Sequence, residues 1–489
     1  MASTTDIRAM IISPTRELAE QIAVEAKKVA AGTGLQVKTA VGGTQKRLGL
    51  VQMQRDGCHL LIGTPGRIKD IFSDPSSGVS APNLNTLILD EADRLLDQGF
   101  ASEIEEIQEL LPNPMKVNRQ TLMFSATVPR SVMQMVRRTM KPEFKFVKTV
   151  RDDEVPTHLT VPQQLVVMPG YENALPAVME LAQQYQARQA QDPNLRPFRA
   201  IVYFNSTNEV KLAAEAFYNF GSHGEPSPLG RMRILEIHSR LTQRERTNSA
   251  NSFRRCSEGI LFSSDVTARG MDFPDVTHVI QIGSPRDRET YIHRLGRTAR
   301  ANKTGEGWLF IHEGEYDFCQ DKLGDLPLAQ DNKSITTASV DMVSGIQGDA
   351  SSPAQQIIAQ VQQAMMDVPS EMRASTIRSM LGVLVPTFSD RRQIVQVLND
   401  LAVHGFGLEE PPAFSATVLN NMGLSRLPGL RVANSMPRRA LNSFDQRSGG
   451  RGFNRRDDYG SRRRDDYNRG GSSRYPRPPT SIFGSRSRY

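Results

Sequence analysis

Three carboxylates follow a short apolar run in the sequence Leu87-Ile88-Leu89-Asp90-Glu91-Ala92-Asp93. Such an apolar run is typical of a buried strand in a parallel sheet. Ligands of these sheets bind beyond the carboxyl ends of the strands, so Asp90 and Glu91 stand where a metal–phosphate centre needs oxygen ligands. A strand that runs into the acidic first turn of a helix has the same pattern, and these residues alone leave both interpretations open.

Short polar motifs also follow other apolar runs. In the first part of the chain they are Pro14-Thr15-Arg16-Glu17-Leu18-Ala19, Gly42-Gly43, Thr64-Pro65-Gly66-Arg67 and Ser125-Ala126-Thr127. In the second part they are Val202-Tyr203-Phe204-Asn205-Ser206-Thr207, Ser264-Asp265-Val266-Thr267-Ala268-Arg269-Gly270-Met271-Asp272 and His293-Arg294-Leu295-Gly296-Arg297-Thr298-Ala299-Arg300. A single motif of this kind can match by chance, but a chance match of the whole series in order is improbable.

The elements that position these motifs are predicted from hydrophobic periodicity. Apolar runs, which we expect to be strands, lie at 10–13, 37–41, 60–63, 86–90 and 121–125, and a second set lies at 200–204, 234–238, 259–263, 278–281 and 307–311. Helical patterns separate them, for example at 17–30 and 104–111. Strands that alternate with helices indicate an α/β fold with parallel sheets, here in two domains. Pro156 and Pro162 bracket a polar stretch that we expect to be an extended linker.

Beyond Ser351 the pattern becomes wholly helical. Ser352-Pro353 is a plausible cap and first helical position, and the apolar residues Ala354, Ile357, Ile358, Val361, Met365 and Val368 then fall on one face. We expect this helical extension to pack on the second domain.

The positive charge is concentrated at the C-terminus. The chain of 489 residues has a formal charge of +7, and residues 443–489 contain 12 Arg, no Lys and 5 Asp, so the remainder is neutral. This Arg/Gly/Ser/Tyr-rich tail, with Arg-Arg-Asp-Asp-Tyr at 455–459 and 463–467, has too few aliphatic side chains to fold and is predicted to be disordered. It is predicted to bind RNA through Arg and Tyr, and a solvated linker is the alternative.

Several classes of protein are disfavoured by composition. No apolar run approaches the length of a membrane span, which predicts no membrane partner. The cysteines Cys58, Cys256 and Cys319 lack the spacing of a zinc site or a disulfide framework. The N-terminus shows neither a signal peptide nor an Arg-rich transit peptide.

The eight motifs together resemble the DEAD-box RNA helicases of superfamily 2. They match motifs Ia, GG, Ib, II, III, IV, V and VI of that family in order, over about residues 8–312. The resemblance implies two RecA-like domains, an RNA-stimulated ATPase, ATP with Mg²⁺, and RNA as partner. The domains are then predicted at 1–150 (domain 1), 151–162 (linker), 163–345 (domain 2), 346–435 (helical extension) and 436–489 (disordered RNA-binding tail).

The resemblance also implies a role for each motif residue. Asp90 would hold Mg²⁺ through water, and Glu91 would polarise the attacking water. Arg297 and Arg300 would act as arginine fingers, since a helical turn would put residues three apart on one face. Asp272 would contact the ribose. Four residues would couple ATP to RNA, namely Asp93, Ser125, Thr127 and His293. The implied RNA-binding residues are Pro14, Thr15, Arg16, Gly43, Thr64, Pro65, Arg67 and Gly270.

These RNA-binding groups predict recognition without sequence preference. Glycines let backbone approach the phosphate–sugar chain, hydroxyls and Arg bind phosphates, and none of them reads a base. Contacts to 2′-hydroxyls would favour RNA over DNA. We therefore expect a monomer that acts on structured or duplex RNA. A translocating DNA helicase or a nuclease subunit is disfavoured, because Asp90–Asp93 reads DEAD and no nuclease metal cluster is visible.

One part of the family pattern is missing. A phosphate loop of the form GxxxxGK[ST] cradles the β- and γ-phosphates, but no Lys follows a Gly anywhere in this sequence. In the family, this loop and an adenine-reading Gln segment precede the motif of residues 14–19 by tens of residues. We therefore expect the first domain to be truncated at its N-terminus. The alternative is an ATP-independent RNA-binding protein that lacks the loop.

The stretch 291–300 and the C-terminal layout are most similar to the fungal mitochondrial DEAD-box helicases that assist intron splicing. This similarity implies a location in the mitochondrial matrix. It also implies a role in splicing of group I and group II introns, in RNA folding or in translation. A nuclear or nucleolar helicase of ribosome biogenesis is the alternative.

Overall fold

The computed structural model describes residues 7–97, 99–127, 130–148, 157–221, 224, 226–268, 270–299, 303–344, 352–425 and 427–433. Arg300, residues 151–156 of the predicted linker and the predicted tail lie outside the described residues.

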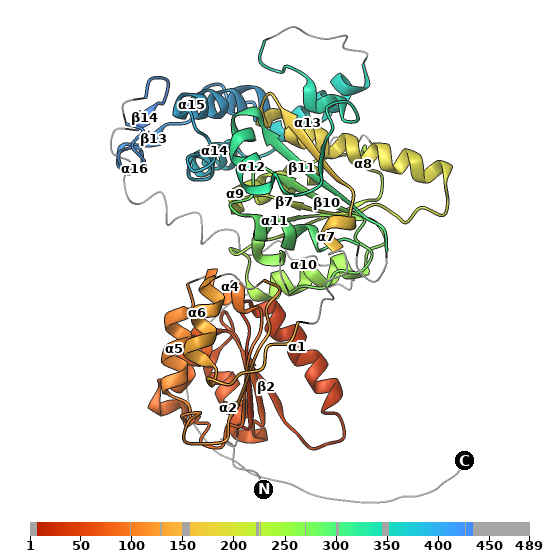
Figure 1. Ribbon diagram of the computed structural model, residues 1–489. Coiled ribbons are helices and arrows are strands. Elements are labelled where there is room, and N and C mark those ends of the chain that lie inside the picture. Colours follow the sequence, from red (N-terminus) through yellow and green to blue (C-terminus); the bar gives the residue numbers. More distant parts are fainter. Residues whose placement is uncertain are drawn as a thin grey trace, which may run out of the picture. The chain divides into compact units, whose positions relative to one another are not determined.

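In the described chain, the first sheet has five parallel strands in the order β2-β3-β1-β4-β5. The strands are β1 (Ala9–Ile12), β2 (Val37–Ala40), β3 (Leu60–Gly63), β4 (Thr86–Leu89) and β5 (Gln120–Met123). The helices are α1 (Arg16–Val29), α2 (Lys46–Asp56), α3 (Pro65–Phe72), α4 (Ala92–Asp97), α5 (Ala101–Glu109) and α6 (Arg130–Thr139). Right-handed crossovers put α1 on one face and α2, α3 and α5 on the other, in agreement with Figure 1. We call this part domain 1.

The spacing of small apolar residues fixes α1 on its face of the sheet. Ala19 and Ala23 are four residues apart, so they lie on one side of the helix, and they pack against Val37, Val41 and Ile62. The opposite face of the sheet forms a separate apolar cluster with α3 and α5. Domain 1 is therefore a three-layer α/β unit.

In the part of the chain that is described, the second sheet has seven strands in the order β12-β6-β11-β10-β7-β9-β8. All its pairings are parallel. The strands are β6 (Gln163–Met168), β7 (Arg199–Tyr203), β8 (Arg233–Ile237), β9 (Gly259–Ser263), β10 (His278–Ile282), β11 (Glu306–His312) and β12 (Leu328–Gln330). The helices are α7 (Thr157–Thr160), α8 (Ala174–Gln191), α9 (Thr207–Tyr218), α10 (Gln243–Arg255), α11 (Arg288–Leu295) and α12 (Tyr316–Leu323), with a short 3-10 turn η3 (Asp265–Thr267). We call this part domain 2.

The C-terminal extension packs on domain 2, as predicted. Its helices are α13 (Pro353–Met366), α14 (Ser370–Leu384), α15 (Arg391–Asp400), a π-helical turn η6 (Leu401–Gly405) and α16 (Ala416–Asn421). The helix α13 contacts α8 and α9, and α14 contacts α9, in one continuous apolar core. Ser352 caps α13 as expected, because its side chain accepts a hydrogen bond from the Gln355 N–H. None of the helices in the described residues is long and apolar enough to cross a membrane.

The predicted parallel-sheet fold is confirmed, and the predicted strands agree with the observed ones to within two residues. Two predictions are wrong. The extension is not wholly helical, since β13 (Phe414–Ser415) and β14 (Val432–Ala433) pair in parallel. The stretch between the two prolines is not extended, because four of its five residues form α7 and the fifth, Val161, is buried. An isolated valine among polar residues gave no periodicity from which this packing could be predicted.

Candidate functional site

The strand order of domain 1 separates the predicted site residues into two groups. The motifs with Gly43, Thr64 and Arg16 follow β2, β3 and β1, which are neighbours in the sheet. Asp90 and Ser125 follow β4 and β5, which are the next two strands. Because the strands are parallel, both groups lie at one carboxyl edge. The predicted RNA-binding and phosphate-binding residues of domain 1 are therefore adjacent but distinct.

The two leading carboxylates differ in backbone conformation, and that of Glu91 is unusual. Asp90 continues the β4 pairing, because its N–H donates to the Ile12 carbonyl at 2.9 Å, and Glu91 then has φ = 50°. A left-handed conformation is costly for a non-glycine residue and is found mainly where the surrounding structure imposes it. The Glu91 carboxyl has an oxygen, Oε2, that is buried without a hydrogen-bond partner among the described residues. This oxygen is free to accept a hydrogen bond from a ligand or water.

Asp90 lies close to two other carboxylates, an arrangement that favours a bound cation. Burial, and then the nearby Glu91 and Asp93 carboxylates, raise the pKa of Asp90. A positive ion would relieve this repulsion and lower that pKa. Among the described residues, no group of three or more His, Cys, Asp or Glu side chains could hold a metal ion. Asp90 and Glu91 thus offer carboxylate oxygens beside which a hydrated cation would fit.

The four predicted coupling residues lie together around Asp93. The Asp93 side chain, 2% exposed, accepts a hydrogen bond from Thr127 Oγ1 at 3.0 Å. Ser125 Oγ accepts from the Asp93 N–H at 3.3 Å and donates to the Thr127 carbonyl at 2.7 Å. His293 of domain 2 places Nε2 3.4 Å from Asp93 Oδ2. The carboxylate motif is therefore joined both to the end of β5 and to domain 2.

Arg294 of α11 connects two loops of domain 2, and sequence reasoning did not single it out. It is 1% exposed and donates to Asp265 at 2.7 Å and to Asn205 at 2.9 Å. Its guanidinium lies over the Tyr203 ring, 5.3 Å from the centroid, which is within the reach of a cation–π contact. Burial acts to raise the pKa of Asp265, but Arg294, Arg94 and Arg286 together lower it. The only signal in the sequence was its place inside the 293–300 motif.

The prediction that a helical turn aligns Arg297 with Arg300 is wrong. The helix α11 ends at Leu295, and Ala299 has φ = 53°, so the chain turns away from helical geometry before Arg300. Arg297 is 8% exposed and donates to the carbonyls of Met271 (2.5 Å) and His293 (3.3 Å). Gly296 caps the end of α11, and the hydrophobic periodicity of the sequence did not predict an end there.

The loop with Gly270 and Asp272 lies against α1 of domain 1. The Asp272 N–H donates to Gln21 Oε1 at 3.3 Å, and Asp272 is exposed. Gly270 has φ = +72°, and a Cβ there would approach Leu18 atoms to 2.6 Å. Only glycine fits this contact without displacing α1. The predicted ribose and RNA residues of domain 2 are therefore positioned by a domain 1 helix.

The predicted RNA-binding residues of domain 1 support one another. A Cβ on Gly42 or Gly43 would come within 3 Å of the Arg16 guanidinium, so the glycines allow this arginine to lie against their backbone. Arg67 donates to the Thr44 carbonyl at 3.1 Å and holds the same loop from α3. Three of the remaining predicted residues lie where helices begin. Thr15 caps α1, and Thr64 and Pro65 begin α3. Pro14 is buried just before α1.

A buried polar network between α1 and α10 was also missed. Arg246 donates to Glu17 at 2.7 Å, and Gln243 donates to Glu17 at 3.2 Å. All three side chains are less than 10% exposed. Arg94 of α4 adds a second link, donating to the Asp265 carbonyl at 2.9 Å. Gln243 and Arg246 are three residues apart on a helix, but nothing in the sequence indicated that their partner is Glu17.

Comparisons with known proteins match the two halves of this chain to two helicase domain families. The family description "DEAD/DEAH box helicase" matches residues 2–136, and "Helicase conserved C-terminal domain" matches residues 188–302. The Aspergillus fumigatus protein "ATP-dependent RNA helicase mss116, mitochondrial" is 59% identical over 433 residues, which cover 88% of this chain and 66% of the relative. The Neurospora crassa protein "ATP-dependent RNA helicase cyt-19, mitochondrial" is 45% identical over 432 residues, which cover 88% of this chain and 67% of the relative.

Among solved structures, Mss116p bound to ssRNA and AMP-PNP is similar at a TM-score of 0.70 and 27% identity, covering 88% of this chain and 83% of that one. The chain thus spans about two thirds of the length of the curated relatives it matches. These matches extend over both sheets and the helical extension. The chain belongs to the DEAD-box ATP-dependent RNA helicases.

Proposed function

We propose that the whole protein hydrolyses ATP when RNA is bound and uses the cycle to separate short RNA duplexes locally. The observation that carries the proposal is the chain of contacts around Asp93. Thr127 and Ser125 join it to the end of β5, and His293 joins it to domain 2. Residues that would sense ATP are thereby connected to the two surfaces that would bind RNA.

On the phosphate side, Asp90 would hold Mg²⁺ through its water shell, and the ion would neutralise developing charge on the phosphates. Glu91 would accept a hydrogen bond from the attacking water at its unpartnered oxygen. Arg297, and Arg300 beyond it, would supply positive charge to the γ-phosphate. Arg297 must then leave the Met271 carbonyl, to which it donates here. Asp272 is exposed and would accept from the ribose hydroxyls.

On the RNA side, the backbone at Gly43 and Gly270 and the side chains of Arg16, Thr64 and Arg67 would hold the phosphate–sugar chain. Thr15 and the buried Pro14 and Pro65 would shape the two helix starts that meet it. None of these groups reads base identity, so binding would be independent of sequence. Hydrolysis and phosphate release would then open the contacts between the domains and release the RNA.

The names of the relatives support a mitochondrial location. We place the protein in the mitochondrial matrix, where structured RNAs such as group I and group II introns would be its substrates. Assistance to RNA folding or translation is consistent with the same unwinding activity.

A second candidate function is an RNA-binding protein without ATP turnover. The observation behind it is that these 489 residues contain no Gly-Lys pair of the kind that the GxxxxGK[ST] phosphate loop uses.

One experiment separates the two functions. ATP hydrolysis by the whole protein is measured with and without a 20-nucleotide single-stranded RNA, and strand separation of a short RNA duplex is followed with and without ATP. RNA-stimulated hydrolysis and ATP-dependent separation support the helicase. RNA binding with no hydrolysis in either condition supports the second function.

A further inference from the structure

The outer edge of β2 is open. β2 is the last strand of its sheet on the side away from the carboxylates, and in the described chain no strand pairs with its outer edge. The carbonyl of Gln36 accepts from His59 N and Leu60 N, and that of Ala40 accepts from Thr64 N, all on the β3 side. Backbone groups alternate along a strand, so the N–H and C=O groups of Val37 and Thr39 point outward. These four groups are available to another strand.

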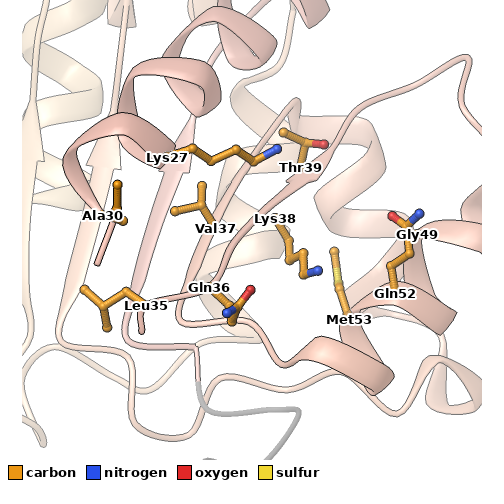
Figure 2. A pocket seen from close by; sticks show the side chains of 11 residues that line it. Lys27, Ala30, Leu35, Gln36, Val37, Lys38, Thr39, Gly49, Gln52 and Met53 are labelled. Atoms are coloured by element: carbon orange, nitrogen blue, oxygen red, sulfur yellow. The ribbon is translucent and has the colours of Figure 1, made fainter. Parts of the chain in front are cut away.

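A cavity of about 350 Å³ lies along this open edge (Figure 2). Its walls are the C-terminal half of α1, the strand β2 with the two residues before it, and one side of α2. Val37 packs toward α1, whereas Ala40 packs toward α2 with Met53, so the Lys38 side chain lies on the α2 side. The edge is therefore flanked by a helix on each side and forms a groove along β2.

Exposed apolar side chains border the groove. Val24, Leu35, Leu48 and Val51 are 50–54% exposed. Val24 is three residues before Lys27, so the two share one side of α1. Leu48 is four residues before Gln52, a cavity-lining residue of α2, so these two share one side of that helix. Proteins normally cover or charge an open strand edge, and apolar side chains beside one mark a docking surface.

The groove is also positively charged. Residues 21–56 contain four Lys and two Arg but one Glu and one Asp, a net charge of +4, in a chain whose first 442 residues are neutral overall. Lys38 pairs with Asp56 at 2.7 Å. Lys27 lines the cavity on the α1 side and forms no ion pair with the described residues. Figure 2 shows its amino group reaching toward Thr39 on the strand.

We propose that this groove binds an extended, acidic segment of a partner protein, which adds a sixth strand to the sheet beside β2. The outward groups of Val37 and Thr39 would pair with its backbone. Alternate side chains of the segment would face α1 and α2, where Lys27 and Lys38 favour acidic residues and Val24 and Leu48 favour aliphatic ones. RNA fits the groove less well, because none of the 11 lining residues is aromatic or Arg and stacking is therefore absent.

The groove is separate from the catalytic carboxylates, which follow β4 at the other side of the sheet. The proposal is therefore independent of ATP turnover, and its test uses binding alone. A fluorescein-labelled peptide of alternating Glu and Val, ten residues long, serves as the probe. A Lys–Val peptide and a single-stranded RNA of equal length serve as comparisons, and binding is measured by fluorescence anisotropy.

Two variants remove the proposed contacts. Lys27→Glu reverses the unpaired charge, and Thr39→Pro removes an outward N–H without touching the β3 side. Lys28→Glu is the matched control, since Lys28 is the next residue but pairs with Glu25 and does not line the cavity. We expect Glu–Val binding to weaken about tenfold in the first two variants and to change less than about twofold in the control. Amide exchange at residues 37–40 should slow when the peptide binds.

Other outcomes would overturn the proposal. They are absence of Glu–Val binding to the unmodified protein, equal weakening by Lys28→Glu, or no slowing of exchange at residues 37–40. RNA binding that falls equally with Lys27→Glu and Thr39→Pro would assign the groove to RNA instead. A dimer in sedimentation that Thr39→Pro dissociates would assign the edge to a second copy of the chain. Thermal unfolding of each variant distinguishes lost binding from lost folding, and the exposed Lys27→Glu remains informative if Thr39→Pro unfolds.

Discussion

The two parallel sheets differ in how completely their strands are covered. In domain 2, every residue of β7, β9 and β10 is buried, between α8 and α9 on one side and α10 to α12 on the other. In domain 1, buried and half-buried residues alternate along β1 and β4, and no residue of β5 is fully buried. Domain 2 therefore buries more of its sheet than the described part of domain 1 does.

The largest expected effect is the loss of stability when a core side chain is truncated in the more deeply buried sheet of domain 2. Phe262 of β9 is fully buried and packs on Phe217, with ring centroids 5.0 Å apart. Phe262→Ala should lower the free energy of unfolding of domain 2 by about 3–5 kcal/mol. Leu122→Ala in half-buried β5 should cost domain 1 about 1 kcal/mol. Fluorescence of Trp308, the single tryptophan, reports domain 2 in urea, and amide exchange of β5 reports domain 1. Equal losses of unfolding free energy in the two variants would contradict the difference in burial between the two sheets.

The second prediction concerns the carboxyl group of Glu172, which is buried in domain 2. Burial, and then Asp400 and Asp341, raise the pKa of Glu172 to about 7. Because this pKa is higher than that of Glu in the unfolded chain, the protonated form of Glu172 favours the folded state. Its contribution to the free energy of unfolding is fully present below about pH 4.5 and is lost as the pH rises through 7. At pH 8, Glu172→Gln should therefore stabilise domain 2, by on the order of 2–3 kcal/mol, and should have little effect at pH 4.

The measurement is urea unfolding followed by Trp308 fluorescence at pH 4, 6 and 8. Glu209, whose pKa burial also raises to about 7, should leave part of the pH dependence in place. The exposed Glu215→Gln on α9 is the control and should change nothing. A Glu172→Gln effect that is the same at all three pH values would contradict the prediction.

The third prediction concerns the contact between the two domains. Arg246→Met leaves Glu17 buried without its cation, so the contact of α1 with α10 should weaken. We expect RNA affinity to fall about tenfold, equivalent to about 1.4 kcal/mol, while Trp308 reports unchanged stability of domain 2. The exposed Arg244→Met is the matched control, and Glu17→Gln in the Arg246→Met background should recover part of the loss. An unchanged RNA affinity would show that the ion pair does not support RNA binding.

The smallest effect is expected from the tail, which lies outside the described residues. Removing residues 443–489 deletes 12 Arg and 5 Asp, so RNA affinity at low salt should fall a few-fold and its salt dependence should flatten. RNA-stimulated hydrolysis at saturating RNA should remain. Fluorescence anisotropy with labelled RNA at 50 and 200 mM salt is the test, and an unchanged affinity and slope would refute the prediction.

The sequence predicted most of the fold because the strands of both sheets are apolar runs between helical patterns. It also predicted which motifs end those strands, and the parallel order then brought Asp90 and Ser125 to one edge. Long-range partners were not predictable. The pairing of Glu17 with Arg246, 229 residues away, depends on how two separate domains meet. The burial of Arg297 depends on a helix that ends at Leu295, which the spacing of Arg297 and Arg300 did not reveal.

The Glu91→Gln variant tests most directly whether the Asp90–Glu91 carboxylates drive RNA-dependent ATP hydrolysis. This variant keeps the side-chain size but removes the charge that would polarise water. We predict that RNA stimulates hydrolysis by the unmodified whole protein, and that Glu91→Gln lowers kcat by about 10²–10⁴ while RNA affinity changes less than about twofold. A wild-type rate in Glu91→Gln, or no RNA-stimulated hydrolysis by the unmodified protein, would contradict this role of the carboxylates.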